Sequence, residues 1–122
     1  MKAIFIIKPT FITLEVIKDF YATFIDNQDG YIRIKRDVIP RHLAEAHYAE
    51  HKGKPFFDEL IEYMTSGDSL IILAPVTSIE EARADTMKFR AKYTKGGCRN
   101  VLHCSDSEEA CIREAELFFP KL

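Results

Sequence analysis

The chain has 122 residues, of which 47% are hydrophobic, so we expect one domain with enough apolar material for a core. Its formal net charge of −2 excludes a positive field over the whole chain, and any phosphate site must therefore be a local cluster of cations. The apolar runs are too short to cross a bilayer and Met1-Lys2 does not resemble a signal peptide, so we expect a cytoplasmic protein without a membrane partner.

Hydrophobic periodicity divides the chain into four strands and five helices. Apolar runs or alternation predict the strands, and apolar residues spaced three or four apart predict the helices. In chain order these are a strand at 3–7, a helix at 14–25, a strand at 31–38, helices at 40–48 and 55–66, a strand at 70–74, a helix at 79–89, a short strand at 101–102 and a final helix ending near 118. Setting aside the short extra helices, this order predicts a ferredoxin-like split βαβ sandwich of the α+β class, with helices packed on a four-stranded antiparallel sheet.

Residues 100–107, Asn-Val-Leu-His-Cys-Ser-Asp-Ser, form the most informative segment. His103 precedes several possible N-cap residues at 105–107, so the free N–H groups of the last helix would point back toward the imidazole and attract an anion. A neutral imidazole can attack phosphorus if its other ring nitrogen is held by an acceptor. Glu114, on the otherwise apolar face of the last helix, could be that acceptor. A strand-end histidine bonded to the backbone is the alternative.

Cations that could bind phosphate lie elsewhere in the chain. Arg83 and Arg90 are seven residues apart and would share one face if the helix ran through, with Thr86 and Met87 between them. Lys8 directly follows the first predicted strand, where its stem can pack while its ammonium group reaches a site. Taken alone, the arginines are better explained as a solvated helix flank, whereas for Lys8 a plain strand-terminating lysine is an equal alternative.

Two aromatic side chains, Tyr48 and Phe56, flank the basic turn at residues 51–55. Either ring could stack on a base, although a Phe-Phe pair at a helix start more often packs in the core. This turn is the only support for nucleic-acid binding, and the net charge argues against a specific nucleic-acid partner. Cysteines 98, 104 and 111 lack the spacing of a zinc site, and we interpret them as reduced thiols.

Several of these residues belong to one longer pattern. In order it consists of Ile6-Ile7-Lys8-Pro9, His47-Tyr48, Lys54-Pro55-Phe56-Phe57, Met64-x-Ser66-Gly67, Arg90 and Asn100-x-x-His103-x-Ser105-Asp106-Ser107. The pattern closely resembles the nucleoside diphosphate kinase family from Ala3 to Phe119, and its His-x-Ser-Asp-Ser signature is highly specific. The resemblance implies an enzyme that moves the γ-phosphate from a nucleoside triphosphate to a nucleoside diphosphate by a ping-pong mechanism.

The resemblance also implies a role for each matched residue. His103 matches the phosphohistidine nucleophile, Glu114 the carboxylate that holds the imidazole, and Ser105 the hydroxyl beside it. Phe56 matches the ring on which the base stacks. The residues that match the grip on the phosphates and the ribose hydroxyl are Lys8, Tyr48, Arg90 and Asn100. Mg²⁺ is the implied cofactor, bridging the nucleotide phosphates with few direct protein ligands, and Asp106 would be a cap or an outer-shell contact rather than a primary ligand.

The sequence departs from the family at the wall of the site. Most of the long Gly- and Pro-containing loop between Arg83 and Arg90 is missing, and we expect Arg83 to bind phosphate with Thr86 as the nearest stand-in for the loop threonine. Gly97-Cys98 replaces an apolar residue followed by glycine, so Phe56 would stack on the base from one side only. Cys104 stands where a small Gly or Ala is usual.

These departures lead to two expectations. The nucleotide site should be more open, and the homo-oligomer should be a dimer, because the loop and the C-terminal extension that many members use in assembly are shortened in a chain ending at Leu122. A nucleotide-binding or scaffold protein of the same fold with little turnover is the alternative. The retention of Lys8, Arg90, Asn100, His103, Ser105 and Glu114 argues for the enzyme.

Overall fold

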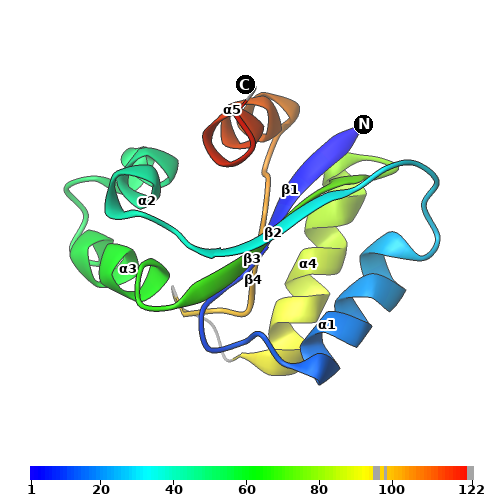
Figure 1. The fold of residues 1–122 in the computed structure, drawn as a ribbon, viewed down its shortest axis with the longest axis horizontal. Coiled ribbons are helices and arrows are strands. Elements are labelled where there is room, and N and C mark those ends of the chain that lie inside the picture. Colours follow the sequence, from blue (N-terminus) through cyan, green and yellow to red (C-terminus); the bar gives the residue numbers. More distant parts are fainter. Residues whose placement is uncertain (95–96, 98, 121–122) are drawn as a thin grey trace.

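The computed structural model describes residues 1–94, 97 and 99–120 (Figure 1). Its sheet contains β1 (Lys2–Ile7), β2 (Arg33–Val38), β3 (Asp68–Pro75) and β4 (Leu102–Cys104), in the order β2-β3-β1-β4 with every neighbouring pair antiparallel. The register sets His103 opposite Ile6 of β1. This topology confirms the predicted split βαβ fold.

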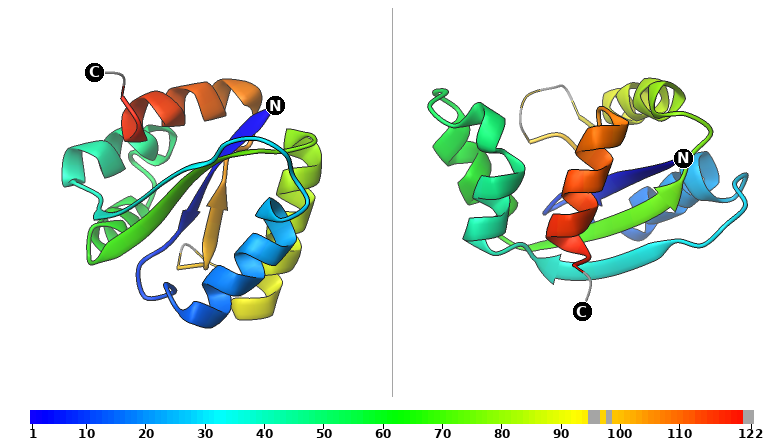
Figure 2. Two further views of the ribbon diagram at one scale, coloured as in Figure 1. Left: turned by 45° about the vertical axis from the view of Figure 1, so that its right-hand side comes forward. Right: turned by 90° about the horizontal axis from the view of Figure 1, so that it is seen from above.

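In the described ranges, seven helical segments connect and cover the strands. They are α1 (Leu14–Phe20), the π-helical turn η1 (Tyr21–Ile25), α2 (Arg41–His47), the 3-10 turn η2 (Ala49–His51), α3 (Phe57–Met64), α4 (Ile79–Tyr93) and α5 (Glu108–Phe118). Helices α1 and α4 lie on one side of the sheet, and α2, α3 and α5 lie on the other (Figure 2). No helix in the described ranges is long and apolar enough to span a membrane.

The central strand β1 supplies both hydrophobic cores. Successive side chains of a strand point to opposite faces, and residues 3–7 are all fully buried. Phe5 faces α1 and α4, where its ring packs against Phe20 and Phe24 at centroid distances of 5.3 and 4.8 Å. Ile4 and Ile6 face α2, α3 and α5. The continuous apolar run in the sequence is therefore explained by burial on both sides.

Several predicted boundaries differ from the structure by a few residues, and three of the differences are informative. The expected helix at 14–25 is α-helical only to Phe20 and continues as a π-helical turn, closed by the Asp26 N–H bond to the Tyr21 carbonyl. Strand β2 begins at Arg33, where its pairing with Leu73 of β3 starts, and Tyr31 before it is 94% exposed. Helix α4 continues to Tyr93, because contacts of its last turn with Asp19 of α1 hold it in place.

Candidate active site

A pocket of about 910 Å³ opens beside β4, on the side of α2 and α5. The predicted site residues that line it are Lys8, Tyr48, Phe56, Arg83, Arg90, Asn100, His103 and Glu114. They come from the end of β1, the segment from α2 to α3, helix α4, the region around β4, and α5. The fold thus brings together groups that lie as far apart in the chain as residues 8 and 114. Ser105 and Thr86 are not among the lining residues.

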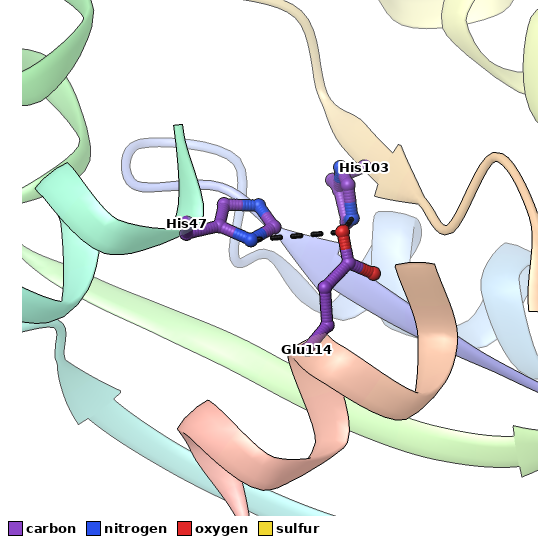
Figure 3. A group of neighbouring side chains, drawn as sticks. All are labelled: His47, His103 and Glu114. Atoms are coloured by element: carbon purple, nitrogen blue, oxygen red, sulfur yellow. Dashed lines mark hydrogen bonds and ion pairs between the residues drawn. The ribbon is translucent and has the colours of Figure 1, made fainter. Parts of the chain in front are cut away.

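His103 is held by Glu114 across the gap between β4 and α5. The His103 Nε2 atom lies 3.1 Å from Oε2 of Glu114, which is 3% exposed (Figure 3). A buried carboxylate accepts a hydrogen bond, so the neutral imidazole donates through Nε2–H. Nδ1 is then the ring nitrogen that carries the lone pair. A nucleophilic nitrogen requires this tautomer.

Ser105 fixes the other oxygen of the same carboxylate. Its hydroxyl donates to Glu114 Oε1 at 2.7 Å and accepts the backbone N–H of Ile4 at 2.9 Å. Ser105 is fully buried and lies behind the carboxylate. Of the N-cap choices at 105–107, Ser107 is the one used, because its side chain accepts the N–H of Ala110. Ser105 thereby connects the carboxylate to the central strand β1.

His47 is a member of this group to which the sequence analysis gave no role, although it stands beside Tyr48 in the family pattern. It is 4% exposed at the end of α2, and its Nδ1 atom lies 3.6 Å from Glu114 Oε2. Its ring meets the His103 ring edge to face, at a centroid distance of 4.6 Å. Burial lowers the pKa of His47 well below 6.5, and the nearby charges of His103, Arg113 and Lys8 act in the same direction. A sequence signal existed, since His47 follows Ala44 at the helical spacing of the buried face.

Within the described part of the chain, His47, His103 and Glu114 also form a group with the spacing of metal ligands, their donor atoms lying within 4.8 Å of one another. The same pocket is lined by the cations Lys8, Arg83 and Arg90, whose charge opposes a divalent ion held against the imidazoles. Both oxygens of Glu114 already accept hydrogen bonds. We therefore interpret His103 and Glu114 as a hydrogen-bonded pair, with His47 packed beside them. The exposed carboxylate of Asp106 also lines the pocket.

The two arginines of α4 bind the backbone on either side of the nucleophile candidate. Arg90 Nε donates to the Leu102 carbonyl at 2.7 Å, and Arg83 Nη1 donates to the Cys104 carbonyl at 3.4 Å. Both lie on one face of a helix that runs unbroken through residues 83–90, as expected from their spacing. Burial and the charge of Arg83 lower the pKa of Arg90, which a guanidinium tolerates without losing its charge. Where the family usually has its long loop, this chain has an uninterrupted helix.

The structure does not bring Thr86 into the pocket. Thr86 is 1% exposed, and its hydroxyl donates to the Ala82 carbonyl at 2.7 Å. Ala82, Thr86 and Phe89 share the buried face of α4, whereas the two arginines occupy the neighbouring face. The spacing between the arginines in the sequence did not show that Thr86 points to a different face of the helix from theirs.

The outer wall of the pocket is aromatic and partly exposed. Phe56 is 38% exposed, with the His51 ring 5.4 Å from its centroid and Lys54 Nζ 5.9 Å from it. The Tyr48 and His51 rings stack at 6.3 Å. On the other side Asn100 donates to the Gly97 carbonyl at 2.9 Å. Cys98 of the Gly97-Cys98 departure lies outside the described residues.

Cys104 replaces the small residue usual next to the histidine, but its side chain packs in the core shared with α1 and α4. It is fully buried, and burial raises the pKa of its thiol to about 11. The thiol therefore stays protonated and does not compete with the imidazole as a nucleophile.

Comparisons with known proteins identify the family of this chain. The family model described as nucleoside diphosphate kinase matches residues 1–122. The nucleoside diphosphate kinase of Methanothermobacter thermautotrophicus is 32% identical over 129 residues, covering 97% of this chain and 86% of its own. That of Listeria welshimeri is 45% identical over 92 residues, covering 66% of this chain and 63% of its own length, just under two thirds.

A crystal structure of the Aquifex aeolicus nucleoside diphosphate kinase superposes on this fold with a TM-score of 0.76. Its sequence is 26% identical, and the match covers 97% of this chain and 94% of that one. Family model, relatives and fold lead to the same conclusion. The chain belongs to the nucleoside diphosphate kinase family.

Proposed function

We propose that this protein transfers the γ-phosphate of a nucleoside triphosphate to a nucleoside diphosphate, with His103 carrying the phosphoryl group between two half-reactions. The observation that carries the proposal is the 3.1 Å contact between His103 Nε2 and Glu114 Oε2 inside a pocket lined by cations. It supports a ring whose second nitrogen is available to attack phosphorus. Membership of the family supports the same reaction.

In the first half-reaction the Nδ1 lone pair of His103 attacks the γ-phosphorus, and the bond from that phosphorus to the bridging oxygen breaks. The nucleoside diphosphate leaves with the electron pair of that bond. In the second half-reaction a β-phosphate oxygen of another diphosphate attacks the phosphorus, the P–N bond breaks, and its electrons return to Nδ1. Glu114 accepts the Nε2–H bond throughout and stabilises the positive charge that develops on the ring.

The cations of the pocket would hold the phosphates. Lys8, Arg83 and Arg90 have the charge needed to neutralise the transferring group, and an anchored guanidinium loses little further freedom on binding. Tyr48 and Asn100 are proposed to bind a phosphate and the ribose hydroxyl. Mg²⁺ is the proposed cofactor; bound to the nucleotide phosphates it would withdraw negative charge, with Asp106 contacting it through water.

The base is proposed to stack on the exposed face of Phe56. Such a contact is tolerant of base identity because every base has a π face. The described contacts of Phe56, with His51 and Lys54, come from its own segment of the chain. We therefore expect several nucleoside diphosphates to act as acceptors with similar efficiency.

The direct test is a phosphoenzyme assay. Incubation with γ-radiolabelled ATP should label the protein with an acid-labile phosphate, and a chase with several unlabelled diphosphates should move the label to the matching triphosphates. The His103→Ala variant should take up no label, whereas His42→Ala, which removes an exposed histidine of α2, should label normally. Label uptake by the His103→Ala variant, or transfer without a phosphoenzyme, would show that the mechanism is wrong.

We further propose that the enzyme acts as a homodimer in the cytoplasm. The edge strand β2 carries the exposed apolar residues Ile34 and Val38, which is the kind of edge that a second copy covers. The uninterrupted helix α4 takes the place of the loop with which many family members pack their subunits. Sedimentation of the purified chain should give a dimer, and a stable hexamer would contradict this proposal.

A further inference from the structure

His47 is a buried polar side chain whose position is hard to explain by stability. Among the residues that the structure describes, neither of its ring nitrogens has a hydrogen-bond partner within bonding distance, and both are shielded from solvent. A buried polar group without a partner destabilises a fold, so such a group calls for a functional explanation. An apolar side chain would pack against Tyr48 and Phe118, whose rings lie 4.4 and 5.3 Å from the imidazole, without that disadvantage.

The polar contact of His47 is with the carboxylate that holds the nucleophile. Its Nδ1 atom lies 3.6 Å from Glu114 Oε2, the same oxygen that accepts His103 Nε2–H at 3.1 Å. Figure 3 shows this carboxylate between the two imidazoles, with His47 approaching from α2 and His103 from β4. A shortening of a few tenths of an ångström would turn the longer contact into an ordinary hydrogen bond.

We propose that His47 is a positioning residue of the phosphoryl-transfer reaction: its Nδ1–H points at Glu114 Oε2 and keeps the Nε2 proton on His103 rather than on the carboxylate. The proposal rests on the proposed function above. Burial among cationic neighbours holds His47 neutral at pH 7, so it offers one N–H and adds no charge next to the phosphates.

The chemical effect follows from sharing one oxygen between two donors. A carboxylate oxygen that accepts a second N–H is a weaker base, so it takes up a proton less readily. When Nδ1 of His103 bonds to phosphorus, the ring becomes positively charged and its Nε2 proton more acidic. With His47 in place that proton stays on the ring, and the phosphoryl group remains attached to a cationic imidazole, which is a good leaving group. No proton enters or leaves the network in either half-reaction.

Two substitutions of similar polarity separate this role from simple packing. In His47→Asn the side-chain amide nitrogen can occupy the place of Nδ1, whereas in His47→Gln it lies nearer the place of Nε2. We expect the Asn variant to retain single-turnover phosphoryl transfer within about threefold of the native rate and the Gln variant to lose about tenfold, with KM for nucleotide unchanged in both. His42→Asn, an exposed change in the same helix, is the matched control.

Stability gives an independent readout. His47→Leu removes two unpartnered buried polar atoms, so its urea midpoint should equal or exceed that of the native protein while its transfer rate falls as in the Gln variant. A structural role for His47 predicts the reverse, a parallel loss of stability and rate. Equal rates for the Asn and Gln variants would also overturn the proposal.

A measurement on the native protein does not depend on any variant folding. The ¹⁵N chemical shifts of the His47 ring should report a neutral imidazole protonated at Nδ1, and protonation at Nε2 would overturn the proposal. The two proposals fail separately. Absence of a phosphoenzyme in the native protein would refute the proposed function, whereas native rates in all His47 variants of a protein that does form a phosphoenzyme would refute only this inference.

Discussion

The two sides of the pocket differ in how firmly the fold holds their side chains. On the β4–α5 side, Glu114 is almost completely buried, and its two oxygens bind Ser105 and His103 at 2.7 and 3.1 Å. On the opposite side, Phe56 is 38% exposed, and its described contacts are a neighbouring ring and a lysine from the same segment. The groups proposed to make and break bonds are thus ordered before a substrate arrives, and those proposed to meet the base are not. Substitutions on the first side should change kcat, and substitutions on the second should change KM.

The largest effect after loss of His103 is expected from Glu114→Gln. The amide can still contact the imidazole, but it lacks the negative charge that stabilises the ring when phosphorus bonds to Nδ1. We expect kcat to fall about 100-fold with KM for the diphosphate nearly unchanged. Steady-state kinetics check this, with the exposed Glu116→Gln of the same helix as the control. A rise in KM without a fall in kcat would contradict a preorganised β4–α5 side.

A smaller change on the same side is Ser105→Ala. It leaves the Ile4 N–H and one oxygen of Glu114 without their buried partner. We expect the free energy of unfolding to drop by about 1–3 kcal/mol and kcat to fall about tenfold. Urea unfolding and single-turnover kinetics measure the two effects. Ser107→Ala, which removes only the N-cap of α5, should cost about 1 kcal/mol with little effect on kcat.

On the open side, Phe56→Ala should raise KM by about tenfold, because base stacking on an aromatic ring contributes about 1–3 kcal/mol. The transfer step itself should keep its rate, since the described contacts of this ring are with His51 and Lys54 and not with His103 or Glu114. Steady-state kinetics with two different acceptor diphosphates would measure the KM and the kcat of this variant. A loss of kcat with unchanged KM would remove the distinction between the two sides of the pocket.

The smallest effect is expected far from the pocket, where Asp19 binds Lys92 Nζ at 2.8 Å and the Tyr93 hydroxyl. These hydrogen bonds lower the pKa of Asp19 in the folded protein below its ordinary value of 3.8. The ionised carboxylate therefore stabilises the fold fully at pH values above 3.8, and this stabilisation is lost as the pH falls through the lowered pKa of the folded protein. Because Lys92 is exposed, Asp19→Asn should cost only about 0.5 kcal/mol at pH 7. Urea unfolding should show that difference shrinking as the pH falls below 3.8, and kcat should not change.

Local patterns were sufficient to predict the topology and to pair His103 with Glu114. Both predictions depend on neighbouring residues in the sequence. The residues of β1 form an uninterrupted apolar run, and Glu114 lies one turn from Cys111 and Phe118 on the buried face of its helix. The π-helical turn after Phe20 escaped prediction, because apolar residues four apart suit an α-helix and a π-turn equally well. The structure distinguishes them by the bond from the Asp26 N–H to the Tyr21 carbonyl, and Phe24 of this turn packs against Phe5 and Phe89.

The parts of the site that escaped prediction depend on contacts between distant elements. The bonds from Arg83 and Arg90 to the backbone of β4 require the crossing of helix and strand, which spacing along α4 does not contain. Thr86 was misjudged for the same reason, since its distance from the arginines in sequence says nothing about which face is buried. His47 occupies an apolar position of a short helix, and its meaning emerges only when α5 brings Glu114 beside it.

The central claim is that His103 carries the phosphoryl group on Nδ1 while Glu114 holds the Nε2 proton. The most direct measurement is ¹⁵N and ³¹P NMR of the phosphoenzyme formed from ¹⁵N-histidine-labelled protein and ATP. The account predicts one phosphohistidine, at His103, with phosphorus bonded to Nδ1 and a proton on Nε2. Phosphorus bonded to Nε2, or an unphosphorylated His103 in a protein that still transfers phosphate, would contradict it.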